Sequence, residues 1–187
     1  MAELSAADAL TELLAGNQRF VDGQPRYGHD ASAAAAASGD QRPIAVLLGC
    51  IDSRVPLEAV FDQGFGAICV VRSGGHVLDR AVLGSVEFAV TALRVPLVMV
   101  LGHSRCGAVQ ATMDVVRGGA HRPAGPLSYL VDEIAPAVRA TVDEPTTLAV
   151  TRTHVARTVE RLRPLAAGAM VTGAVYDLDS RRVGLLD

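Results

Sequence analysis

The sequence predicts an α/β fold in which helices cover a mainly parallel sheet. Four short apolar segments have the length and composition of buried strands: residues 44–48, 67–71, 97–101 and 170–176. Five segments with helical periodicity separate them: residues 56–62, 81–93, 108–117, 127–140 and 147–162. Strands that alternate with helices are typical of a parallel sheet with both faces buried.

The two ends of the chain add one element each to this core. Apolar residues recur at helical spacing between Leu4 and Phe20, which predicts an amphipathic helix, and Gly16-Asn17 and Gly23 are expected to mark its end. Residues 31–37 are rich in alanine and form either a short helix or a surface connection. We therefore expect a single domain over residues 1–187, with residues 1–40 as an N-terminal helical arm. Residues 175–185 predict a final hairpin that adds an antiparallel edge strand.

Composition excludes several classes of partner. The net charge is −3 and the chain has no run of Lys or Arg, which argues against nucleic acid. The longest apolar run, residues 95–101, is far shorter than the roughly 20 residues that span a membrane. The first residues do not resemble a signal peptide, so we expect a cytoplasmic protein without a membrane partner.

Two strands lead directly into residues that can bind a metal. Cys50 follows the first strand, and His103 and Cys106 follow the third. In open α/β sheets ligands bind at the carboxyl ends of strands, where the strand order reverses. If Cys50 and His103 share one metal, the first and third strands are neighbours. The sheet order is then 2-1-3-4, with the reversal beneath the site.

The residue types indicate catalytic zinc. His103 and Cys106 are three residues apart, so we expect them on one face of the first turn of a helix, where the N-terminus favours a thiolate. Two thiolates and one imidazole suit tetrahedral Zn²⁺, at one ion per chain. Cys69 lies in the middle of the second strand and is expected in the core. Three protein ligands leave one coordination position open, as in catalytic zinc sites.

Asp52 and Arg54 follow the ligand Cys50 closely. An ionised carboxylate here can accept a hydrogen bond from a hydroxide on the zinc, and a guanidinium beside it keeps it ionised and oriented. Taken alone, Asp52 and Arg54 would be read first as an ordinary loop ion pair. Next to a metal ligand the catalytic interpretation is favoured.

These motifs resemble the β-class carbonic anhydrases, whose signatures are Cys-x-Asp-Ser-Arg and His-x-x-Cys. Here they read Cys50-Ile51-Asp52-Ser53-Arg54 and His103-Ser104-Arg105-Cys106. Residues 14–20, 71–76 and 84–89 also resemble family segments. Ser73 and Gly74 depart from the commoner residues, and we expect only local consequences.

The resemblance implies a zinc lyase (carbonate dehydratase) that reversibly hydrates carbon dioxide to bicarbonate and a proton. A zinc-bound hydroxide would attack the substrate, oriented by Asp52, which Arg54 holds. The resemblance also implies a homodimer or homotetramer, an N-terminal helix that embraces the partner, and an apolar substrate pocket at the dimer interface. Gln63 would reach that pocket from the neighbouring subunit. Phe88 and Val77 are either pocket walls or plain core residues.

Several alternatives stay open from the sequence. Related scaffolds hydrolyse carbonyl sulfide or carbon disulfide with the same zinc ligands. A noncatalytic zinc-binding or bicarbonate-binding module is a second alternative, although it would not need Asp52 and Arg54. Asp52 could also serve as a fourth zinc ligand in a closed state at low pH. His76 is either a proton relay or structural, and His29, His121 and His154 are expected at the surface.

Overall fold

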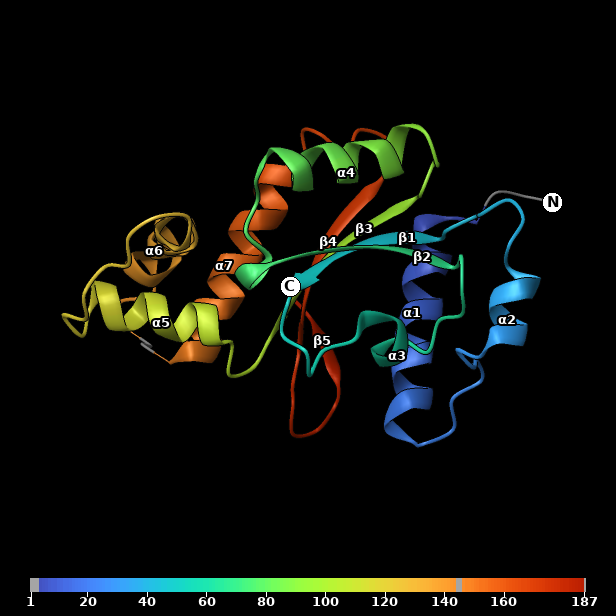
Figure 1. Cartoon of the computed structure of the whole chain (residues 1–187), viewed down its shortest axis with the longest axis horizontal. Helices are drawn as coiled ribbons and strands as arrows, with labels where there is room; N and C mark the ends of the chain where they lie inside the picture. Colours follow the sequence, from blue (N-terminus) through green and yellow to red (C-terminus); the bar gives the residue numbers. More distant parts are fainter. Residues whose placement is uncertain (1–3, 144–145, 187) are drawn as a thin grey trace.

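Five strands form one sheet in the order β2-β1-β3-β4-β5 (Figure 1). The computed structural model describes residues 4–143 and 146–186. Strands β1 to β4 are parallel and β5 is antiparallel to β4. The bounds are Ala45–Cys50 (β1), Ile68–Ser73 (β2), Leu97–His103 (β3), Met170–Tyr176 (β4) and Val183–Leu185 (β5). The predicted order 2-1-3-4 and the antiparallel edge strand are confirmed.

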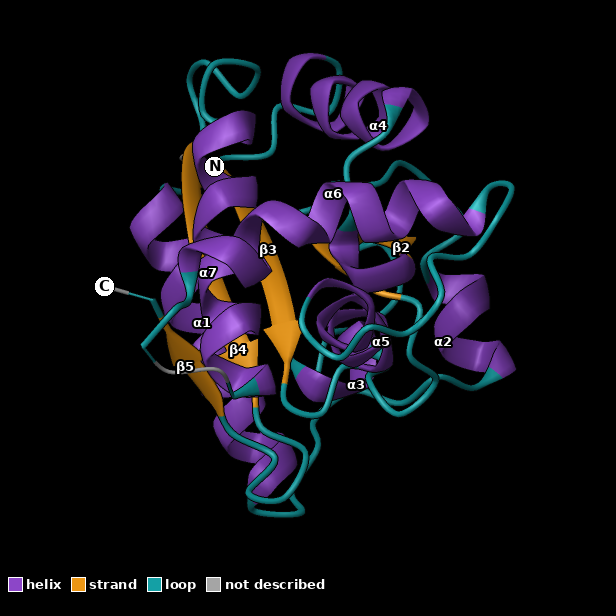
Figure 2. Ribbon diagram, turned by 90° about the vertical axis from the view of Figure 1, so that its left-hand side faces the viewer, coloured by secondary structure: helices purple, strands orange, loops and turns teal. Residues whose placement is uncertain are grey.

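Helices cover both faces of this sheet and extend beyond one end of it (Figures 1 and 2). The bounds are Ala6–Val21 (α1), Ala31–Ala36 (α2), Leu57–Val60 (α3), Arg80–Thr91 (α4), Gly107–Val116 (α5), Leu127–Ala140 (α6) and Thr147–Leu162 (α7), with a 3₁₀ turn η1 at Gly74–His76. Helices α5 and α6 lie beyond the carboxyl ends of the strands, at the left of Figure 1. Within the described ranges, no helix combines the length and apolar character that a membrane span requires.

The central strands are apolar throughout because both of their faces are buried. Leu47 and Met99 belong to the cluster beneath α1 and α3, whereas Leu48 and Val100 belong to the cluster beneath α4 and α7. A third cluster lies between α5, α6 and α7 and includes Cys50. The carboxyl end of β1, at Cys50, therefore lies in a packed apolar region.

Helix α1 continues through the residues expected to end it. A side chain at Gly16 would place its Cβ 1.8 Å from the carbonyl oxygen of Phe61, so only glycine allows this close approach. Asn17 donates to the carbonyls of Val60 and Arg181 and accepts from the amide of Val183. The prediction that Gly16-Asn17 marks the helix end was wrong, because both residues serve helix docking.

The arm after α1 is tied to the same chain. Asp62 is buried at the turn after α3, accepts from the backbone amides of Arg26 and Tyr27, and pairs with the Arg19 side chain. Burial pushes the pKa of Asp62 upward, but the hydrogen bonds from Arg19 and these amides outweigh it and lower that pKa. Helix α2 has no buried residue. Helix α1 is thus packed on its own domain, whereas no residue from 22 to 42 is buried.

Candidate metal centre

The two neighbouring strands β1 and β3 bring the expected ligands together. Cys50 is the last residue of β1, His103 is the last residue of β3, and Cys106 caps the N-terminus of α5. Their ligand atoms, two sulfurs and one ring nitrogen, lie within 4.8 Å of one another, and all three residues are buried. These residues could hold a metal ion.

The segment from His103 to Cys106 is not the helical turn that the spacing predicts. It leaves the strand, passes through Arg105 with a φ of 55°, and begins the helix only after Cys106. Ser104 anchors it, because its amide donates to the carbonyl of Tyr176 and its hydroxyl accepts from the amide of Leu178. A strand end and a helix cap therefore supply the two ligands, and the neighbouring strand β4 fixes the turn between them.

The protonation pattern of the ligands fits a soft divalent cation. Nδ1 of His103 lies 2.9 Å from the carbonyl oxygen of Ser104, to which it donates, so the lone pair of Nε2 faces the two sulfurs. That Nε2 is buried and has no hydrogen-bond partner among the described residues. A hydrogen bond from Cys106 lowers the pKa of Cys50, and the resulting Cys50 thiolate raises the pKa of Cys106. A cation between the sulfurs would favour both thiolates, and sulfur with imidazole nitrogen is a donor set suited to zinc.

Asp52 and Arg54 form a bidentate pair beside these ligands. Arg54 donates from Nε to Oδ1 at 2.9 Å and from Nη2 to Oδ2 at 2.7 Å, and its backbone amide also donates to Oδ1. The hydrogen bonds from Arg54 hold the pKa of Asp52 well below its usual range. Oδ2 of Asp52 lies 3.9 Å from Nε2 of His103. An ionised carboxylate is thus held next to the free nitrogen of the metal group.

Two further groups support the loop that carries Cys50 and Asp52. Arg72 donates from Nε to the carbonyl of Cys50 at 2.8 Å and from Nη2 to the carbonyl of Asp52 at 2.6 Å. The amide of Gly75 donates to Sγ of Cys50 at 3.3 Å. Sequence reasoning gave neither residue a role at the metal. The paired register of Cys50 with Ser73 places both beside the ligand, and that register cannot be read from spacing alone.

The sequence model of the carbonic anhydrase family matches residues 45–183. The chain belongs to the β-carbonic anhydrase family. The matched residues include every strand of the sheet except the end of β5, and they include the three candidate metal ligands. The enzymatic class follows from this membership, and the resemblance seen in the two motifs is confirmed.

Two relatives and one solved structure describe how closely the chain follows this family. "Carbonic anhydrase 2" of Mycobacterium tuberculosis is 41% identical over 92% of this chain and 88% of that protein. A "Carbonic anhydrase" of Mycolicibacterium smegmatis is 42% identical over 91% of this chain and 88% of its own length. A structure described as one of two tetrameric beta-carbonic anhydrases from Sordaria macrospora covers 96% of this chain and 97% of that one, with a TM-score of 0.73 and 20% identity. The last likeness shows the β-carbonic anhydrase fold.

The three expected pocket residues lie in different parts of the chain. Val77 is buried in the same cluster as Cys50 and Cys106. Gln63 is buried elsewhere, and its Nε2 donates to the carbonyl of Phe61 at 3.0 Å. Phe88 is 59% exposed on α4. Only Val77 therefore adjoins the metal group of its own chain.

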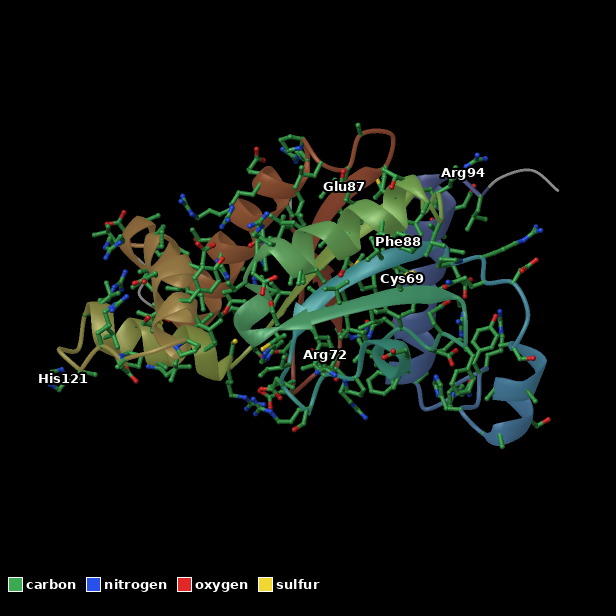
Figure 3. The ribbon with its side chains drawn as sticks, turned by 45° about the horizontal axis from the view of Figure 1, so that its top comes forward. Cys69, Arg72, Glu87, Phe88, Arg94 and His121 are labelled. Atoms are coloured by element: carbon green, nitrogen blue, oxygen red, sulfur yellow. The ribbon has the colours of Figure 1, made fainter. Side chains whose placement is uncertain are left out.

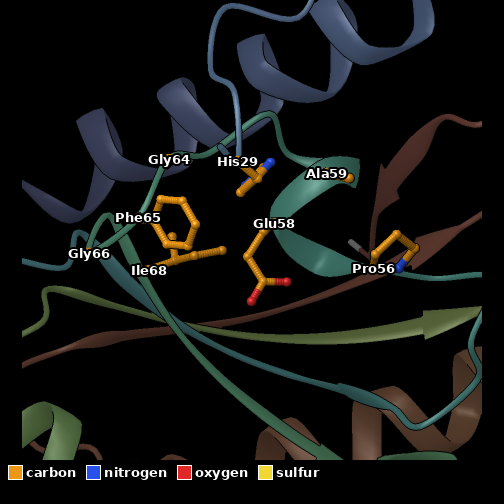
Figure 4. A pocket seen from close by; sticks show the side chains of 8 residues that line it. All are labelled: His29, Pro56, Glu58, Ala59, Gly64, Phe65, Gly66 and Ile68. Atoms are coloured by element: carbon orange, nitrogen blue, oxygen red, sulfur yellow. The ribbon is translucent and has the colours of Figure 1, made fainter. Parts of the chain in front are cut away.

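Two hollows on the described part of the surface are lined by residues other than the metal ligands. One of about 700 Å³ runs between β2 and α4, where Cys69, Arg72 and Phe88 lie along it (Figure 3). Cys69 is only half-buried there, so its expected place in the core is only partly correct. The second hollow, of about 320 Å³, is shown in Figure 4 and is lined by His29, Pro56, Glu58, Ala59, Gly64, Phe65, Gly66 and Ile68.

The histidines outside the metal group correct one prediction. His29 and His121 are exposed as expected, but His154 is buried on the inner side of α7. Its Nε2 donates to the carbonyl of Gly75 at 2.9 Å. His76 is also buried, with its ring 4.5 Å from that of His154 and without a hydrogen-bond partner among the described residues. The helical period could have revealed His154, since it lies four residues after the buried Val150 and four before the buried Thr158.

Proposed function

We propose that this chain is a zinc-dependent enzyme that reversibly hydrates carbon dioxide to bicarbonate and a proton, with one zinc ion per chain. The observation that carries the proposal is the Asp52 carboxylate, held by Arg54 at 3.9 Å from the unpaired nitrogen of His103. A purely structural metal site has no need for an ionised acceptor beside its ligands. Membership of the β-carbonic anhydrase family supplies the reaction class.

Cys50, His103 and Cys106 would hold the zinc and leave its fourth position open. When bound, zinc would supply Lewis acidity that lowers the pKa of water and so makes hydroxide available as the nucleophile. Asp52 would accept a hydrogen bond from that nucleophile and so orient it toward the substrate carbon. Arg54 keeps Asp52 ionised and directed away from the cation. The proton released on hydration leaves to solvent or buffer.

Two thiolates reduce the effective charge of the zinc more than two imidazoles would. The pKa of the water at this site should therefore lie above the value of about 7 known for sites with three imidazoles. Activity is expected to favour alkaline conditions. The thiol ligands also support a cytoplasmic location, because free cysteines persist in reducing compartments.

A second copy of the chain is the partner that best fits the β2 side of the molecule. β2 is the last strand on its side of the sheet, and its residues are only half-buried. Phe88 is exposed above this edge, in the hollow that Arg72 also lines. Covering this face would bury Phe88, which would then line a space shared by the two subunits. Sedimentation should show a dimer or tetramer, and Phe88→Glu should shift it toward monomer; an unchanged assembly counts against this face.

Stopped-flow hydration of carbon dioxide, run beside turnover of carbonyl sulfide and carbon disulfide, tests the main proposal. We expect carbon dioxide to be the preferred substrate and elemental analysis to find about one zinc per chain. Preference for a sulfur substrate would indicate the related hydrolase. Zinc without any turnover would indicate a noncatalytic binding module.

A further inference from the structure

A buried contact links helix α7 to one of the metal ligands. Nε2 of His154 donates to the carbonyl of Gly75 at 2.9 Å, and the amide of the same Gly75 donates to Sγ of Cys50 at 3.3 Å. His154 is 4% exposed and Cys50 is 5% exposed, so water does not compete for either bond. One residue of backbone therefore separates a side chain on α7 from the sulfur that would bind zinc.

The backbone at this point needs support from outside. Gly75 has a φ of 61° and His76 a φ of 47°, so two successive residues lie in the left-handed region. A non-glycine residue rarely adopts this conformation, and it persists where the surroundings over-determine it. A Cβ at Gly75 would also approach Cδ1 of Ile134 to 2.9 Å, so a side chain there would have to displace Ile134. The hydrogen bond from the His154 side chain to the carbonyl of Gly75 restrains this turn.

The protonation state of His154 suits a permanent donor. Burial lowers the pKa of His154 to about 4, so its ring is neutral at neutral pH. Because its partner is a carbonyl oxygen, the single ring proton lies on Nε2. The charged groups that act on its pKa are Glu133, Arg161 and Arg157, and the ring of His76 packs against it.

We propose that His154 is a positioning residue of the metal centre: by holding the carbonyl of Gly75, it keeps the Gly75 amide on the sulfur of Cys50. A hydrogen bond to a ligand sulfur withdraws charge from it, so the ligand donates less charge to the metal. Loss of His154 frees this amide and makes Cys50 a stronger but less oriented donor. The inference rests on the proposed function only in naming zinc as the metal.

Three variants separate positioning from simple structural support. His154→Leu removes the donor, and His154→Gln restores an N–H group at the same distance from the backbone. Thr158→Val is the matched control, since its buried hydroxyl donates to the carbonyl of His154 within the same helix. Each protein is loaded with Co²⁺, and its sulfur-to-metal absorption band and its affinity for zinc against a chelator are measured.

We expect His154→Leu to shift the absorption band and to weaken zinc binding by about 10-fold or more, in line with loss of an outer-shell partner. The His154→Gln and Thr158→Val proteins should retain the band and the affinity. A folded His154→Leu protein with an unchanged band and affinity overturns the proposal. So does an equal shift in Thr158→Val, because it would indicate general loosening of α7.

The unaltered protein provides a second test if His154→Leu does not fold. With ¹¹³Cd in place of zinc, NMR should show a coupling between the Gly75 amide proton and the metal, and a slowly exchanging proton on Nε2 of His154. Absence of either signal overturns the proposal. None of these readouts requires turnover, so they are independent of whether carbon dioxide is the substrate.

Discussion

The ion pair of Asp52 and Arg54 lies on the solvent side of the metal ligands, whereas Gly75 and His154 lie on the protein side. The Arg54 side chain is 52% exposed, and His154 is 4% exposed. An exposed ion pair adds little stability, so stability does not explain the bidentate geometry of Asp52 and Arg54. A buried hydrogen bond is costly to break, so His154 can fix a backbone position. Chemistry is therefore expected on the first side and geometry on the second.

The largest effect should come from removing a ligand that both sides share. Cys106→Ala deletes one of three protein ligands, and we expect zinc to be lost on dialysis together with all measurable hydration. Elemental analysis after dialysis checks the metal content. Full zinc retention in this variant would show that the metal group is wrongly assigned.

Arg54→Ala should separate the solvent side from metal binding. Asp52 loses its bidentate partner while Cys50, His103 and Cys106 stay in place. We expect unchanged zinc content and hydration slowed by about 10²-fold or more, as for loss of one preorganised electrostatic partner. Stopped-flow assays measure the rate. Near-normal turnover would mean that the pair is structural.

The protein side should be revealed by the pH dependence of stability. Because the pKa of His154 falls from 6.5 to about 4 on folding, the unfolded chain binds its proton first as the pH is lowered. This residue's contribution is therefore complete above about pH 6.5 and is lost progressively as the pH falls toward 4, by about 3 kcal/mol. Urea unfolding of the metal-free protein and of His154→Gln measures the difference. Parallel stability curves for the two proteins would contradict it.

The smallest expected change is a movement of one carboxylate. Water is a weaker zinc ligand than hydroxide, so below about pH 8 we expect Asp52 to leave Arg54 and to occupy the fourth position on zinc. The two states need differ by only a few kcal/mol. Crystals of the zinc protein grown on both sides of pH 8 provide the test. If Asp52 stays on Arg54 in the acidic form, loss of activity at low pH is simple titration of water.

Features fixed by short-range patterns could be predicted from the sequence. Buried strands are apolar runs, so the sheet order and the meeting of Cys50 with His103 followed from strand ends and one topology rule. The turn from His103 to Cys106 was misread because an i, i+3 spacing is equally compatible with a strand end followed by a helix cap. Spacing constrains which residues can meet, but it does not decide the backbone between them.

Features fixed by contacts between distant segments could not be predicted. His154 was expected at the surface from its polar sequence context; the helical period is compatible with its burial, but its partner, the carbonyl of Gly75, lies 79 residues away and cannot be read from that period. Gly16 was expected to mark the end of the helix. It is glycine instead because the backbone of Phe61 lies too close for a side chain. In each case the deciding atom belongs to main chain, which sequence letters do not encode.

The three hydrogen bonds of Asn17 have a consequence for the order of synthesis. Two of its partners, Arg181 and Val183, lie 164 and 166 residues further along the chain. At translation rates of about 5–20 residues per second, they leave the ribosome roughly 8 to 33 s after Asn17. During that interval α1 lacks part of its docking site, and Ala9 and Leu13, which are fully buried later, have no complete surface to cover them. Helix α1 is thus made first but completes its docking contacts among the last. In a chain truncated before Arg181, it would lack two of the three hydrogen bonds of Asn17.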